Sequence, residues 1–212
     1  MTALRGRQAE AERNDRLVLN AARLVVARYG ADAPVAAIAE LAGVGMGSLY
    51  RRYGSKDELL RRLCTLAMQD TIQAAERALA DPDPWAGLAG YVQACVAQRT
   101  GALGALAGSI ETTPDMWATS KRSRDLLGRL AARAAKAGVL RPDVTVLDIA
   151  WLIEALGRSG QPDATSEDEV IRQRLTTIAI DGLRAGPARS TLAGPPPDAR
   201  HYEGRWQTGR PG

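Results

Sequence analysis

The 212-residue sequence contains no phenylalanine, a single histidine and only two cysteines, Cys64 and Cys95. Each cysteine lies in an apolar helical pattern without a CxxC motif or a Cys/His cluster, so we expect neither a disulfide framework nor a zinc site. Neither cysteine has a base at helical spacing, and His201 lies in a Pro/Gly-rich stretch. No pair of nucleophile and base can therefore be proposed, and the sequence predicts no enzyme, no metal and no cofactor.

Long apolar runs are also missing. Arg, Asp, Gly or Gln interrupts every apolar stretch well before the roughly 18 residues that a membrane span requires. Charged residues from Arg5 to Arg13 exclude the apolar region of a secretory signal. With 45% apolar and 25% charged residues, the composition is that of a globular chain. We therefore expect a cytoplasmic protein without a membrane partner.

Positive charge is concentrated at one end of the chain. The first 62 residues hold eleven basic and seven acidic groups, whereas the remaining 150 hold seventeen of each, so the net charge of +4 lies entirely in the first segment. Clustered cations gain affinity for phosphate by releasing counterions, which favours a nucleic-acid partner. A general abundance of arginine would give the same excess, so charge alone leaves the partner open.

Alanine and leucine dominate and β-branched runs are short, a balance that predicts an all-α fold. No alternating apolar/polar run or internal repeat indicates a strand or a solenoid. Apolar periodicity predicts four helices in the first part of the chain, and glycines mark the ends of the first three. These helices cover residues 10–29, 34–42, 46–53 and 55–79.

The motif Asp81-Pro82-Asp83-Pro84 separates this part from the rest. Further helices are predicted over 84–99, 102–112, 115–137, 143–158 and 166–184. Five prolines and five glycines among residues 185–212 predict a flexible tail, with Tyr202 or Trp206 as the residues that could pin it to the rest of the protein. The expected organisation is therefore a basic domain over 10–56, a helical domain over 57–184 and the tail.

Helices of about 20, 8 and 8 residues with a Gly-Val-Gly turn predict a helix-turn-helix over residues 34–54. At 100° per residue, Leu49 and Tyr53 point inward. The outward face carries Gly47, Ser48, Tyr50 and Arg51. Glycine allows close backbone approach, hydroxyls bind phosphate or base edges, and arginine can pair with guanine. Lys56 lies in the first turn of the next helix, where free N–H groups also favour phosphate.

Residues 17–60, and above all IAELAGVGMGSLYRRYGSKDEL, resemble the N-terminal domain of TetR-family transcriptional repressors, in an actinobacterial-style variant. The resemblance implies that the residues touching double-stranded DNA are Gly45, Met46, Gly47, Ser48, Tyr50 and Arg51, with Lys56 on phosphate. The sequence departs from the family at three positions. Pro34 stands where many members have Ser or Thr, Gly45 replaces a common Ser, and Met46 replaces a frequent Lys or Arg. Because of these departures, the sequence does not decide whether the first helix of the motif makes the phosphate contacts that are usual in the family.

The resemblance also implies a homodimer that binds a palindromic operator and releases it when a small-molecule effector enters the C-terminal domain. The candidate effector-binding residues are Gln98, Arg99, Leu103, Leu106, Glu111, Met116 and Trp117. Apolar stripes on helices 143–158 and 166–184 predict a dimer interface that contains Leu147, Trp151, Leu175 and Ile178. The same stripes could instead close the core of the monomer.

Two hypotheses other than a DNA-binding regulator concern the same residues. Gly43, Gly45 and Gly47 do not follow a strand or fit GxGxxG spacing, which argues against a nucleotide loop. The departures from the family would also fit a helical small-molecule-binding or scaffold dimer whose DNA-binding face has decayed. Neither the operator nor the effector follows from the sequence.

Overall fold

The structure is a computed structural model that describes residues 2–158, 165–186 and 190–207. Over these residues the regular elements are helices, with one isolated β-bridge between Leu140 and Arg184. The elements are α1 (Thr2–Tyr29), the 3-10 helix η1 (Gly30–Asp32), α2 (Val35–Ala42), α3 (Met46–Tyr53), α4 (Lys56–Ala80), α5 (Pro84–Ala97), the 3-10 helix η2 (Thr100–Leu106), α6 (Pro114–Lys136), α7 (Val146–Arg158), α8 (Ser166–Leu183) and α9 (Ala199–Gly204). The prediction of an all-α fold is confirmed.

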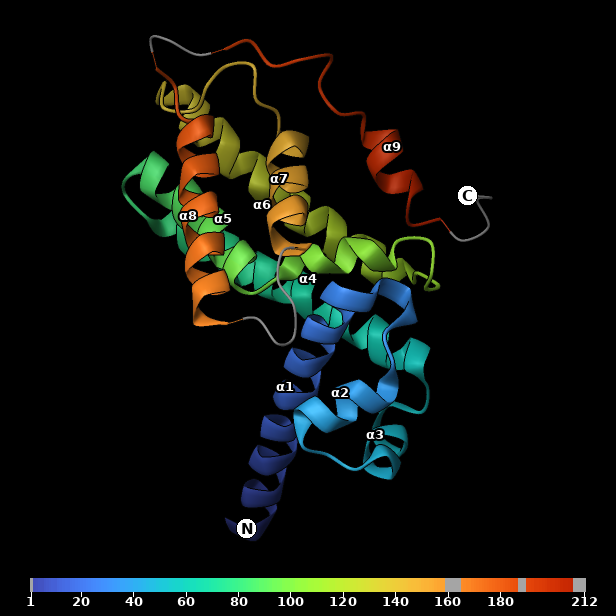
Figure 1. Cartoon of the computed structure of the whole chain (residues 1–212). Coiled ribbons are helices and arrows are strands. Elements are labelled where there is room, and N and C mark those ends of the chain that lie inside the picture. The colour runs from blue at the N-terminus through green and yellow to red at the C-terminus, as the bar shows by residue number, and fades with distance from the viewer. Residues whose placement is uncertain (1, 159–164, 187–189, 208–212) are drawn as a thin grey trace.

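The first three helices form a small unit at one end of the molecule. In Figure 1, α2 lies beside α1, α3 lies on the far side of α2 from α1, and α4 runs from this unit into the rest of the protein. Fully buried side chains from each of the four helices meet in one core: Val25, Ile38, Leu49, Leu59 and Leu63. Removing each such side chain from water contributes about 1.5 to 3 kcal/mol. This burial fixes α3 against α1 and α4.

The second unit is a helical bundle built on the other half of α4. α6 and α5 pack against α4, and α7 packs against α5 and η2. Val92, Leu130 and Ile149 are among the side chains that these helices bury together. Over the described residues, no helix combines the length and the apolar character needed to cross a membrane.

The segment predicted as a helix over 102–112 is different in the structure. It forms the short 3-10 helix η2 followed by an irregular stretch. In a 3-10 helix residues i and i+3 are eclipsed, so Gly101 and Gly104 lie on the same face. A Cβ atom would come within 2.3 Å of the Ile153 carbonyl oxygen at Gly101 and of the Glu154 carboxylate at Gly104. Close approach of η2 to α7 therefore determines this geometry, which apolar periodicity does not detect.

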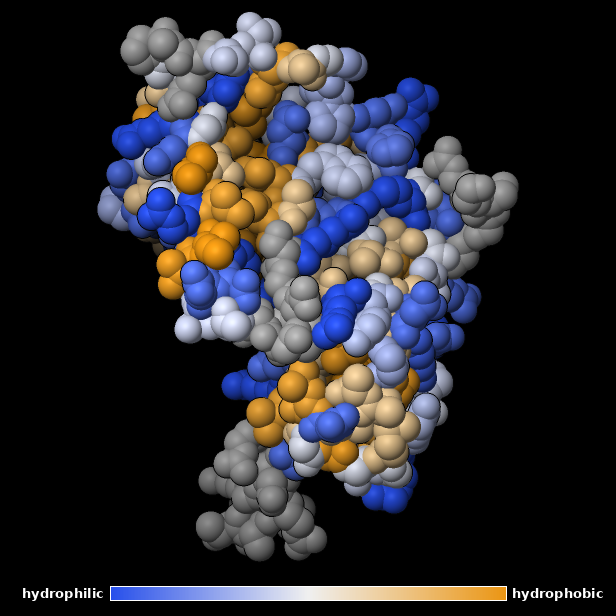
Figure 2. Space-filling model, viewed as in Figure 1, coloured by the Kyte–Doolittle hydropathy of each residue, from blue (hydrophilic) through white to orange (hydrophobic). Residues whose placement is uncertain are grey.

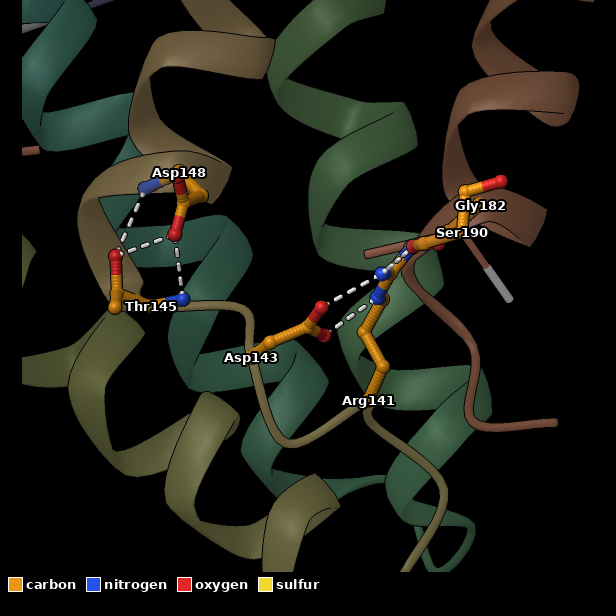
Figure 3. Close-up of polar contacts among 6 residues, drawn as sticks. All are labelled: Arg141, Asp143, Thr145, Asp148, Gly182 and Ser190. Atoms are coloured by element: carbon orange, nitrogen blue, oxygen red, sulfur yellow. Dashed lines mark hydrogen bonds and ion pairs between the residues drawn. The ribbon is translucent and has the colours of Figure 1, made fainter. Parts of the chain in front are cut away.

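The chain before α7 is joined to the end of α8 by Arg141 (Figure 3). Its guanidinium donates to both carboxylate oxygens of Asp143, at 2.6 and 2.7 Å, and to the carbonyl oxygens of Gly182 and Ser190. Thr145 caps α7, and its N–H donates to the Asp148 carboxylate at 2.7 Å. The Arg141 contact with Ser190 joins the C-terminal segment to the bundle.

Part of the segment predicted as a flexible tail, residues 185–212, forms a short helix that contacts the bundle. Residues 199–204 form α9, which lies beside the bundle in Figure 1. The Trp151 ring of α7 is stacked with His201 and meets Tyr202 edge-on, with ring centroids 6.2 and 5.5 Å apart. Aromatic contacts and ion pairs hold this segment despite its many prolines and glycines. Residues 187–189 and 208–212 of the predicted tail lie outside the described residues.

Candidate nucleic-acid interface and cavity

The α3 helix buries one face and exposes the other, as its sequence predicts. Leu49 and Tyr53 are 2% and 7% exposed and pack in the core shared with α1 and α4. The six predicted DNA-contacting residues of the turn and α3, from Gly45 to Arg51, are all exposed, and Lys56 is half-buried at the start of α4. The structure therefore brings the predicted set together on one surface.

Two glycines leave space on this surface. A Cβ atom at Gly45 would meet nothing within 4 Å, and one at Gly47 would meet only the Arg51 guanidinium at 3.5 Å. Packing within the chain therefore does not require glycine at either position. Arg51 donates to the Ser48 hydroxyl at 2.9 Å, so the guanidinium lies over α3 rather than against another helix. The surface beside the glycines is open to a second molecule.

A polar cluster ties α3 to α1. The Asp15 carboxylate of α1 accepts hydrogen bonds from the Arg52 guanidinium and, at 2.7 Å, from the Tyr53 hydroxyl. Burial alone would raise the pKa of Asp15, but the hydrogen bonds from Arg52 and Tyr53 bring it below its ordinary value. Burial and the bond to Asp15 raise the pKa of Tyr53. The sequence analysis missed this cluster because Asp15 and Arg52 are far apart in the chain.

The second domain contains a cavity of about 180 Å³. Its wall is formed by α4, α5, η2, α6, α7 and the C-terminal segment around α9. Of the predicted effector-binding residues, Leu103, Met116 and Trp117 line it. The other four, which do not line the cavity, are Gln98, Arg99, Leu106 and Glu111.

The reasons for these four exclusions differ. Leu106 is fully buried in the core shared with α1, and Glu111 is exposed to solvent. Gln98 and Arg99 lie where α5 ends and the chain turns, with Arg99 in a left-handed conformation at φ 52°. The sequence analysis includes these four residues among the effector-binding candidates because they lie close to Leu103, Met116 and Trp117 in the sequence.

The carboxylate in the wall, that of Glu154, was not predicted. It lies on α7 on the same buried side as Ile149, Ile153 and Gly157 and is 4% exposed. An acidic residue at a buried position of an apolar helical stripe is a signal that the sequence does contain. Tyr202 and Trp206 of the C-terminal segment also line the cavity.

Both cysteines line the same cavity. Burial raises the pKa of the Cys64 thiol to about 12 and that of the Cys95 thiol to about 11. The thiols are therefore protonated at neutral pH and act as small apolar wall groups rather than nucleophiles. Among the described residues, no group of three or more His, Cys, Asp and Glu side chains is arranged to hold a metal ion.

An apolar patch covers the outer face of α8. Figure 2 shows this patch in orange at the position that α8 occupies in Figure 1. Its large exposed side chains are Val170, Ile171, Leu175 and Ile178. Of the predicted interface residues on α7, Leu147 is half-buried, and Trp151 contacts α9 of the same chain. Trp151 therefore does not belong to the patch on α8.

The fold and the exposed face of α3 define a helix-turn-helix DNA-binding protein with a helical second domain that contains a cavity. Residues 18–63 match the family described as bacterial regulatory proteins, tetR family. Residues 83–185 match the C-terminal domain described as transcriptional regulator SbtR-like. The two matches span most of the chain, so the chain belongs to the TetR family of transcriptional regulators.

Solved structures agree with this assignment. The TetR transcription regulatory protein from Mycobacterium vanbaalenii is 27% identical, with a TM-score of 0.56 over 84% of this chain and 99% of that chain. The TetR-like regulator LfrR from Mycobacterium smegmatis, solved in complex with proflavine, is 25% identical, with a TM-score of 0.59 over 79% and 97%. The ketosteroid transcriptional regulator of Mycobacterium tuberculosis shares the fold at 22% identity, with a TM-score of 0.57 over 82% and 96%. No match was found among curated protein sequences.

Proposed function

We propose that this regulator is a homodimeric repressor that binds a palindromic operator through α3 and releases it when a small molecule enters the cavity. The observation that carries the proposal is the exposed face of α3, on which open glycines, hydroxyls and Arg51 lie together. Side chains of this kind bind phosphate and read base edges in the major groove. The excess of positive charge in residues 1–62 supports the same partner.

The 3-10 helix η2 connects the cavity with the DNA-binding unit. Leu103 lines the cavity and also belongs to the core that contains α1, α2 and α3. Ala105 lies opposite Gly30 at the end of α1, where an added Cβ would be 3.6 Å from the Ala105 Cβ. A ligand that moves η2 therefore changes the support of α1. This connection is the physical route by which we expect the cavity to control DNA binding.

The exposed apolar patch of α8 supports dimerisation. Four large apolar side chains on one helix face are costly to leave in water, and a two-fold axis would bury the same patch on both copies. Two recognition helices held about 34 to 36 Å apart can enter successive major grooves.

LfrR, whose structure holds proflavine, shows that a relative of this fold accepts a small organic molecule. We propose that the cavity of this chain also binds a small organic molecule, without proposing that the molecule is proflavine.

The direct test is fluorescence anisotropy with labelled duplexes from the DNA upstream of the gene. We expect saturable binding that weakens steeply as salt rises, since each phosphate contact releases counterions. Scrambled duplexes of the same composition provide the control for specificity. Absence of binding to every duplex, for a folded protein, would overturn the repressor proposal and favour the helical small-molecule-binding or scaffold dimer.

A further inference from the structure

The C-terminal segment places a cation against the most buried carboxylate of the cavity. The Arg205 guanidinium donates through Nη1 and Nη2 to the two carboxylate oxygens of Glu154, each at 2.8 Å. The Glu154 side chain is 5% exposed, and that of Arg205 is 19% exposed. Arg158, on the same helix, also donates to Glu154. Glu154 and Tyr202 both line the cavity, so Arg205 is held directly against two of its wall residues.

Aromatic rings complete the environment of Arg205. The guanidinium carbon lies 4.1 Å from the Trp151 ring centroid and 5.0 Å from that of Tyr202. A planar cation is thus held by a two-point hydrogen bond at its edge and by ring faces at its sides. The Nε atom of Arg205 is buried and has no hydrogen-bond partner. The pair is therefore not fully satisfied, which makes the guanidinium easier to replace.

The small volume of the cavity indicates that the C-terminal segment fills part of a larger site. Sites for drug-sized ligands are typically about 300 to 1,000 Å³. The space left beside α9 is about 180 Å³, and Tyr202 and Trp206 occupy part of the wall. α9 lies beyond residues 83–185, the range that matches the C-terminal domain of the family. The segment therefore fills, from outside that matched domain, a site that would otherwise be larger.

We propose that α9 is an internal ligand of the cavity, with Arg205 occupying the subsite for a planar organic cation such as an amidinium or guanidinium. This inference rests on the proposed function, because it names the ligand class of the same cavity. A cation that offers two N–H donors on one edge replaces Arg205 on Glu154, stacks on the Trp151 face that Arg205 covers, and displaces α9. A neutral molecule of the same shape leaves the buried Glu154 carboxylate with Arg158 as its remaining cation and gains less.

The attachment of α9 to the bundle fits displacement by a ligand. Besides the contacts of Arg205, an ion pair joins Glu203 of α9 to Arg124 of α6 at 2.9 Å, and both of those side chains are partly exposed. Exposed ion pairs contribute about 0 to 1 kcal/mol. The Arg141 contact with Ser190 holds the start of the segment in place while its end moves. A ligand that displaces α9 must also replace the contacts of His201 and Tyr202 with Trp151.

The test compares benzamidine with benzamide, which has the same shape but no charge, by calorimetry on the full chain. We expect Arg205→Ala to bind benzamidine at least about tenfold more tightly than the wild type, because the competing cation is gone. Benzamide affinity should change less than about threefold. The matched control is Arg200→Ala, since Arg200 is also on α9 but its side chain is 94% exposed. This control should leave both affinities unchanged.

Glu154→Gln in the Arg205→Ala background should remove the preference for benzamidine. If Glu154→Gln does not fold, hydrogen exchange of the wild type keeps the proposal testable. Benzamidine should then accelerate amide exchange in the peptide that covers residues 199–206, whereas benzamide should not. Unchanged or weaker benzamidine binding by Arg205→Ala, or slower exchange in that peptide, would show that α9 is a fixed wall and overturn the inference. DNA binding without ligand tests the proposed function separately, so the two failures can be told apart.

Discussion

At the residue scale, the exposed face of α3 combines groups that act on DNA in different ways. Arg51 lies over α3 beside Ser48, where its guanidinium can reach base edges. Lys56 lies at the start of α4, where its ammonium group and free backbone N–H groups both attract phosphate. We therefore propose that Arg51 selects a base sequence and that Lys56 binds phosphate in any sequence.

Arg51→Ala should relax base preference at one position in each half-site, at a cost of about 1 to 3 kcal/mol for the preferred base. Lys56→Ala should instead weaken binding to all duplexes alike, because a phosphate contact is independent of sequence. Selection of binding sites from a random library separates the two effects. Unchanged specificity of Arg51→Ala would mean that its side chain contacts phosphate or solvent.

Gly47→Ala tests whether the open surface of α3 serves close approach to DNA. The added Cβ meets no backbone atom of the chain, and alanine has a higher helix propensity by up to about 1 kcal/mol, so the protein should be at least as stable. DNA affinity should nevertheless fall at least several-fold, because the methyl group blocks the approach of the duplex. Thermal unfolding and anisotropy measure the two effects.

Gly90→Ala is the matched control for this prediction. Gly90 lies exposed on α5, and an added Cβ there also meets nothing within 4 Å. This variant should gain similar stability and keep its DNA affinity. Equal DNA affinity of Gly47→Ala and the wild type would remove close approach as the role of Gly47.

At the scale of elements, the orientation of α3 depends on its link to α1. Asp15 is held by Arg52 and Tyr53, the two residues that follow Arg51 in the chain. Leu49 and Tyr53 bury the inner face, but the polar cluster fixes rotation and position at the C-terminal end. A loosened cluster should therefore affect DNA binding more than folding.

Asp15→Asn should lower stability by about 1 kcal/mol at pH 7, because the pair with Arg52 is partly exposed and screened. The pKa of Asp15 is depressed in the folded state, so its stabilisation is present above the ordinary carboxyl pKa of about 3.9 and is lost as pH falls through the lower folded value. Denaturant unfolding from pH 7 to pH 2.5 should show the gap between wild type and variant closing only below about pH 4. A constant gap would indicate that the charge of Asp15 does not act.

Local patterns predicted the DNA-binding helices, but not the walls of the cavity. The inward positions of Leu49 and Tyr53 follow from helical spacing within eight residues and the glycines at the ends. η2 depends on the approach of Gly101 to α7, and α9 depends on Trp151 and Glu154, which lie some fifty residues earlier. Contacts at this separation override composition, which is why a Pro/Gly-rich segment carries an ordered helix. Periodicity cannot reveal them.

At the scale of the whole molecule, we propose that the patch on α8 determines how two copies meet. Ile178 is 63% exposed, the highest value among the large apolar side chains of the described residues. We expect it near the centre of the dimer interface. The α7 surface around Trp151 is covered by α9, so the interface we propose rests mainly on α8.

Ile178→Asp should dissociate the dimer at micromolar concentration, because it would bury a charge without a partner. Operator affinity should fall with it, while the helical content of the monomer is retained. Sedimentation and circular dichroism test these outcomes. Gln173→Asp adds the same charge to an exposed position on another side of α8 and should remain dimeric. A folded Ile178→Asp protein that is still dimeric would place the interface elsewhere.

The close packing of Gly101 against the α7 backbone leaves no slack between η2 and α7. Interiors packed at this density transmit a displacement instead of absorbing it. A ligand that pushes α7 aside must therefore carry η2, and its contact with α1, along with it. Such linkage is reciprocal, so the factor by which a ligand weakens operator binding is also the factor by which the operator weakens ligand binding. The operator-bound dimer would then respond at a higher ligand concentration than the free dimer, and the DNA would help to set the threshold of its own release.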